Sequence, residues 1–280
     1  MPKDFRATTL ERAIGRTLSR WRDDRSLSLL EAGNRVGFSS AKLSMMENAM
    51  QPSMVVDIMA LGYVYKVPTP EWQFLTSQAQ HAADLRACHQ PQTVIFDPAE
   101  DFPLLIADAT RLRMFATGTV PAVFQLPDYM TATVRWEDSA KAAQLSRVRE
   151  IWATRSSGDD PIAIEAIFPE AVLRQAVGGR RVLKAQLLHL MEVSQRPEVS
   201  LRVVLDAADA YPAMSCPFTW LSFPHRQHND VVYTETYLRS EYIESDTQVE
   251  QATERFFALK TIALKEDETL TFIADSAARI

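Results

Sequence analysis

Hydroxyl groups and one ammonium group are concentrated between residues 39 and 45, in the run Ser-Ser-Ala-Lys-Leu-Ser-Met. Serine and lysine can donate hydrogen bonds to base edges or phosphates, and small apolar side chains can contact a thymine methyl group. Lys42 can reach a base or a phosphate, whereas Arg16 is expected to contact only the phosphate backbone. The candidate nucleic-acid contacts are Ser28, Arg35, Ser39, Ser40, Ala41, Lys42, Ser44, Met45 and Arg16.

Other chemistry has weaker support in the sequence. His225 and His228 have a spacing that metal sites use, but no carboxylate or cysteine stands at ligand spacing, so a pair of surface-loop histidines is the simpler interpretation. Neither a G-x-S-x-G motif nor a glycine-rich phosphate loop occurs, and eight glycines in 280 residues are few for a nucleotide-binding enzyme. We therefore expect no catalysis, no cofactor and no metal.

Local signals predict two short helices that would position residues 39–45. Ser28 can cap the first helix and forms a capping-box pattern with Glu31. Gly37 can adopt the left-handed conformation that ends this helix, and Ser39 can cap the second. Leu43 and Met46 would face inward. Two short helices joined by a glycine turn form a helix-turn-helix unit, whose second helix can enter the major groove of DNA.

The flanking residues extend this pattern. Residues 9–22 have apolar side chains at helical spacing, Arg12, Arg16 and Arg20 recur every four residues along the same helix, and Pro52-Ser53 begins a further helix. Over residues 9–68 the chain resembles the XRE-type (lambda-repressor-like) DNA-binding domain. The resemblance is carried by Gly37-Phe38-Ser39, Lys42-Leu43-Ser44, Met46-Glu47 and Pro52-Ser53. It implies sequence-specific binding of double-stranded DNA.

Charge is divided unevenly along the chain. The net charge is −6, but residues 1–66 hold ten Lys/Arg against seven Asp/Glu, a balance of +3, which leaves −9 for the rest. A mildly basic head on an acidic body is typical of a regulator whose head alone contacts DNA. Within residues 36–53, however, Lys42 is the only basic residue, so Arg12, Arg16, Arg20 and Arg35 would have to supply phosphate contacts.

Beyond residue 90, helical and extended patterns alternate. The candidate strands are 162–168, 199–205, 218–223 and 230–234, and the candidate helices are 102–112, 129–137, 140–155, 170–177, 182–195 and 246–264. The predicted fold is an all-α N-terminal helix-turn-helix domain, residues 1–88, followed by a mixed α/β (α+β) C-terminal domain, residues 89–280. No apolar run is long enough to span a membrane and no signal peptide is evident, so a cytoplasmic protein is expected.

The segment V-P-A-V-F-Q-L-P-D-Y at residues 120–129 is similar to a pattern usually written V-P-G-L-L-Q-T-x-x-Y. With the motifs that follow it, this segment resembles the C-terminal domain of actinobacterial XRE regulators described as antitoxin-like. Ala122 and Pro127 depart from that pattern, whereas Gln125 and Tyr129 keep it. The resemblance implies a regulator that is often paired with a small partner protein.

The sequence therefore predicts a transcription regulator that binds double-stranded DNA, forms a homodimer, and senses a small-molecule effector or a small protein partner through its C-terminal domain. One alternative is an antitoxin-like protein-interaction module with a weakened DNA-binding head. Another is an enzyme in the C-terminal domain, for which no constellation is recognisable. Salt-dependent DNA binding separates the first two hypotheses.

Overall fold

The computed structural model describes residues 5–88, 98–136, 139–236 and 239–280. These residues form two compact units, one within Met1–Asp97 and His225–Asn229, the other within Pro98–Pro224 and Asp230–Ile280. Each unit is described by itself. The domain boundary predicted at residues 88 and 89 adjoins residues 89–97, which lie outside the described part of the chain.

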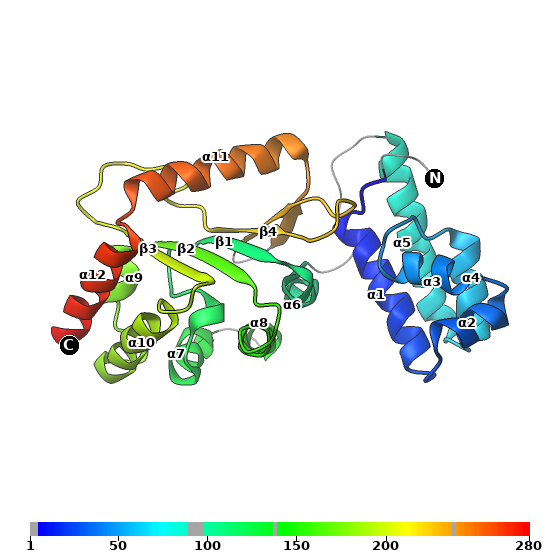
Figure 1. The fold of residues 1–280 in the computed structure, drawn as a ribbon, viewed down its shortest axis with the longest axis horizontal. Coiled ribbons are helices and arrows are strands. Elements are labelled where there is room, and N and C mark those ends of the chain that lie inside the picture. The colour runs from blue at the N-terminus through cyan, green and yellow to red at the C-terminus, as the bar shows by residue number, and fades with distance from the viewer. Residues whose placement is uncertain (1–4, 89–97, 137–138, 237–238) are drawn as a thin grey trace. The chain divides into compact units, whose positions relative to one another are not determined.

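The first unit is helical (Figure 1). Its elements are α1 (Thr9–Asp23), α2 (Leu29–Val36), α3 (Ser40–Glu47), α4 (Val55–Val64) and α5 (Thr69–Cys88). Capping boxes start two of these helices: Thr8 with Glu11 before α1, and Ser28 with Glu31 before α2. The side chains that the sequence predicts to face inward are buried in one core: Leu10, Ile14, Leu18, Trp21, Leu43 and Met46.

The second unit is built on a six-stranded sheet with the order β3-β2-β1-β4-β5-β6. Its strands are β1 (Arg111–Phe115), β2 (Ala163–Pro169), β3 (Val199–Val204), β4 (Phe218–Ser222), β5 (Val231–Glu235) and β6 (Ser240–Ile243). Strands β1, β2 and β3 are parallel, and β4, β5 and β6 continue the sheet as antiparallel neighbours. The central strand β1 therefore joins a parallel half to an antiparallel half.

Helices cover both faces of this sheet, with α11 on one face and α6, α7, α8 and α10 on the other (Figure 1). The remaining bounds are α6 (Pro98–Asp108), η1 (Ala122–Phe124), α7 (Pro127–Thr133), η2 (Val134–Trp136), α8 (Ser139–Arg155), α9 (Glu170–Arg174), α10 (Arg180–Val193), α11 (Asp246–Ile262) and α12 (Glu266–Ala278). Within the described residues, no helix is both long and apolar enough to cross a membrane.

The predicted fold class, an all-α head followed by a mixed α/β domain, is confirmed. The predicted helix 102–112 was wrong at its end: the helix stops at Asp108, and Arg111 begins β1 instead. Strand pairing decides this point, because β1 is hydrogen-bonded on both sides, to β2 and to β4. Strand β6 and helix α12 were not predicted, and α9 ends at Arg174 rather than at residue 177.

The segment at residues 120–129 has a packing role. The buried Gln125 side chain donates to Val120 O at 2.7 Å. Gln186, on α10, accepts from Leu126 N and donates to Phe124 O, both at 2.8 Å. These amides satisfy backbone groups of the turn that would otherwise be buried without partners, which costs free energy. The polar residues of this segment thus hold the turn against α10.

Candidate nucleic-acid interface

The turn between α2 and α3 has the geometry predicted for it. Gly37 has φ +79° and ends α2 in the left-handed conformation, and Phe38 N donates to Gly33 O at 2.9 Å. Ser39 then caps α3 by accepting from Lys42 N at 3.1 Å. Two short helices are therefore joined by a tight turn, the arrangement by which helix-turn-helix units present their second helix.

Close packing of α1 against the end of α3 fixes the position of that second helix. A Cβ atom on Gly15 would lie only 2.5 Å from Glu47 O, so the α1 backbone can approach α3 only because residue 15 is glycine. Leu43 and Met46 are fully buried on the same side of α3. The opposite side of α3 is consequently left for other contacts.

The outer face of α3 carries the short side chains that the sequence singled out. Ser40 and Ala41 are exposed, and Ser44 and Met45 are partly exposed. Ser28 and Ser39 lie at the starts of α2 and α3 and are exposed, but their hydroxyl groups serve as helix caps. A contact to DNA from either residue would have to coexist with its cap.

Lys42 is not a free cation. Its ammonium group lies 3.0 Å from Asp57 Oδ1 on α4 and 3.7 Å from the centre of the Phe38 ring. The Lys42 side chain is 36% exposed and that of Asp57 15%. The single basic group of α3 is therefore held by a carboxylate and an aromatic ring, an arrangement that a phosphate would have to compete with. Sequence reasoning missed Asp57.

The arginines of the head differ in how far they reach solvent. Arg35 is exposed in the last turn of α2, Arg16 is partly exposed on α1, and Arg20 pairs with Glu71 at 3.4 Å. Arg12 is buried, so the expectation that it could supply an outward phosphate contact was wrong. Beside Lys42, the exposed cations of the head are therefore Arg20 and Arg35, with Arg16 partly exposed.

Glu47, one of the residues that carry the resemblance to XRE-type heads, faces inward. Its carboxylate accepts two hydrogen bonds from Arg22 of α1, at 2.8 Å from Nε and 2.7 Å from Nη2. The hydrogen bond to Glu47 raises the pKa of Arg22 above its ordinary value against the opposing effect of burial. This pair joins α1 to the end of α3 and removes a negative charge from the outer face.

In the described part of the chain, no group of three or more His, Cys, Asp or Glu side chains could hold a metal ion.

An open hollow of about 430 Å³ lies between the starts of α7 and α10. Its lining is mainly apolar and consists of Leu126, Pro127, Asp128, Arg181, Val182 and Ala185.

Comparison with known proteins places the second unit in a family. No curated protein and no solved structure matches the chain. Residues 100–275 match the sequence model of a family described as "Domain of unknown function (DUF5753)". That span is well over half of the 280 residues and contains all six strands. The chain therefore belongs to the DUF5753 family.

Proposed function

We propose that this chain is a dimeric, sequence-specific transcription regulator. Its α-helical head would bind operator DNA through α3, and its DUF5753 domain would sense a small-molecule effector or a small protein partner. The observation that carries the proposal is the turn at Gly37, which joins two capped helices and leaves Ser40 and Ala41 exposed on α3. The resemblance to XRE-type heads over residues 9–68 supports it.

The charges of the head support a moderate, salt-sensitive affinity. Arg20 and Arg35 are exposed and Arg16 is partly exposed, and Lys42 would leave Asp57 to reach a phosphate. Each phosphate contact contributes about one unit to the slope of log affinity against log salt concentration. Because the head offers few such contacts, a dimer that engages two half-sites about one helical turn apart would supply the missing affinity.

Salt titration of DNA binding tests this proposal. The full chain and the variants Lys42→Ala and Arg16→Ala are titrated with random-sequence duplex DNA, then with a duplex selected by the parent protein. Each variant should lower the salt slope by about one unit. Arg279→Ala, at the far end of the chain, is the control and should bind like the parent. Parent-like binding by both head variants at low salt would refute the proposed orientation of the head.

A second function, protein binding by the head, has its own observation. Helix α4 exposes Val56, Met59 and Tyr63, with Tyr63 84% exposed. Their spacing places them on one side of the helix, and clustered apolar side chains of this kind mark interaction surfaces. If the chain shows no salt-dependent DNA binding while Tyr63→Ser abolishes a protein complex, the head is an interaction module instead.

A further inference from the structure

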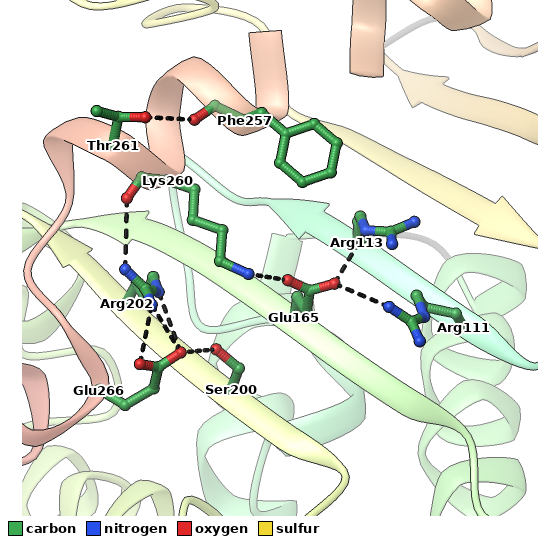
Figure 2. Close-up of polar contacts among 9 residues, drawn as sticks. All are labelled: Arg111, Arg113, Glu165, Ser200, Arg202, Phe257, Lys260, Thr261 and Glu266. Atoms are coloured by element: carbon green, nitrogen blue, oxygen red, sulfur yellow. Dashed lines mark hydrogen bonds and ion pairs between the residues drawn. The ribbon is translucent and has the colours of Figure 1, made fainter. Parts of the chain in front are cut away.

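Three cations surround one carboxylate on the α11 face of the sheet. Glu165, on β2, lies 2.9 Å from Arg113 Nε and 3.5 Å from Arg111 Nη1 through Oε1, and 2.5 Å from Lys260 Nζ through Oε2. Figure 2 shows both arginines, from β1, on one side of Glu165, and Lys260 reaching it from α11 on the other. One carboxylate balances one positive charge, so this group carries an excess of two.

The neighbouring charges do not cancel this excess. Arg202, on β3, is bound by both carboxylate oxygens of Glu266 and is balanced by it. Asp230 accepts hydrogen bonds from Ser222 and from Trp220, the ring on which Arg113 stacks, and no ion pair to it occurs among the described residues; its negative charge lowers the local excess from two to one but does not remove it. Although burial opposes it, the hydrogen bond from Lys260 and the charges of Lys260 and Arg113 lower the pKa of Glu165, which therefore stays ionised.

The two arginines keep donors in reserve. Among the described contacts, Arg113 uses only Nε as a donor, and Arg111 approaches Glu165 without a hydrogen bond. Arg113 Cζ lies 4.1 Å from the centre of the Trp220 ring, which holds the guanidinium plane in place. Its side chain is 12% exposed, whereas that of Arg111 is 47% exposed. The guanidinium group of Arg113 is thus oriented by packing, and that of Arg111 is open to solvent.

We propose that Arg111, Arg113 and Lys260 form a binding site for a compact, multivalent oxyanion, such as a phosphoryl or polycarboxylate group of a small effector. Planar guanidinium forks match the paired oxygens of such groups, and Arg111 and Arg113 project from the same face of one strand. Glu165 acts as the resident counter-ion that keeps the three cations together before the ligand arrives. The proposal gives a ligand class to the sensing role of the proposed function, and it rests on that function only for the consequence on DNA.

Binding is measured on the full chain by calorimetry in a phosphate-free buffer. Pyrophosphate and citrate are the probes, and sodium chloride at the same ionic strength is the reference. Saturable binding of either probe supports the site, and the probe that binds tells phosphoryl from carboxylate chemistry. Arg111→Gln should weaken binding about tenfold or more, the usual effect of losing a hydrogen bond to a charged group. Arg239→Gln, an exposed arginine on the same domain paired with Glu241, should bind like the parent.

A second substitution is expected to change the binding affinity in the opposite direction. Glu165→Gln removes the competing carboxylate and should tighten binding, provided that circular dichroism shows a folded protein. If Glu165→Gln does not fold, Arg111→Gln carries the test alone, because Arg111 is largely exposed. A response no larger than that to sodium chloride, or equal binding by the parent and Arg111→Gln, would overturn the site. If a probe binds saturably but does not change the affinity of the chain for DNA, the anion site is supported and its coupling to DNA binding is refuted.

Discussion

At the scale of single residues, Gly37 can be tested in isolation. Its φ of +79° is costly for a side chain, but a Cβ atom there would meet nothing within 4 Å. Gly37→Val should therefore lower the free energy of unfolding of the head by about 1–2 kcal/mol through backbone strain alone. Gly37→Asn is the control, because asparagine tolerates this conformation better. Chemical denaturation measures both, and equal stability of valine and asparagine variants would contradict the strain argument.

The pair of Lys42 and Asp57 gives a second prediction at this scale. Asp57→Asn removes the carboxylate that holds Lys42 and one negative charge near α3. We expect tighter DNA binding by the variant, because Lys42 no longer has to give up an ion pair before it contacts a phosphate and because one negative charge near α3 is gone. Fluorescence anisotropy with a labelled duplex measures the DNA affinity of the variant and of the parent. Asp84→Asn, an exposed acid of α5, is the control, and weaker binding by Asp57→Asn would mean that the ion pair orients α3 for DNA.

Local signals made part of this site predictable. The capping box of Ser28 with Glu31 and the turn at Gly37 depend on residues at most a few positions apart. The residue types at these positions therefore predict where α2 begins and ends. The partners of Lys42 and Glu47 are different. Asp57 follows Lys42 by 15 residues and Arg22 precedes Glu47 by 25, and only the packing of α1, α3 and α4 brings them together.

At the scale of elements, the buried pair of Arg22 and Glu47 holds α1 to the end of α3. The Glu47 side chain is 5% exposed, so Glu47→Ala would remove the buried partner of Arg22 and leave it the exposed carboxylate of Asp23 and the carbonyl of Leu27. Because these partners remain, the loss should fall below the roughly 3–5 kcal/mol that breaking a fully buried pair costs. Thermal or chemical unfolding of the head measures the loss. The double variant Arg22→Met, Glu47→Leu should recover most of it, and failure to recover would point to a role beyond charge balance.

Elements were predictable where the hydrophobic pattern was unambiguous. Strands β2, β3, β4 and β5 are rich in branched and aromatic residues and were predicted within one or two residues of their bounds. Strand β1 reads Arg-Leu-Arg-Met-Phe and follows directly on a helix, so its short pattern merges with that of α6. Its identity as the central strand comes from pairing with β2 and β4, which lie 50 to 110 residues further along the chain.

At the scale of the whole molecule, we predict that residues 90–280 fold alone and carry self-association. The second unit has its own sheet and its own core under α11, in which Phe256 packs edge-on against Trp220. Sedimentation of this fragment at tens of micromolar, roughly where a useful dimer should persist, measures its oligomeric state. A folded monomer would move dimerisation to the head.

The anion site was not predictable from the sequence, because Arg111, Glu165 and Lys260 are spread over 150 residues and only the fold brings them together.

The strand order has a consequence for synthesis on the ribosome. Strand β1 pairs with β4, whose first residue, Phe218, emerges about 5–20 s after Phe115 at ordinary rates of translation. During that interval β1, β2 and β3 can assemble, but β1 exposes an unpaired edge. Such an edge is a template for association with other chains. A nascent chain paused before Phe218 should therefore be a preferred client of ribosome-associated chaperones, whereas helices α1 to α5 of the head have all emerged by then.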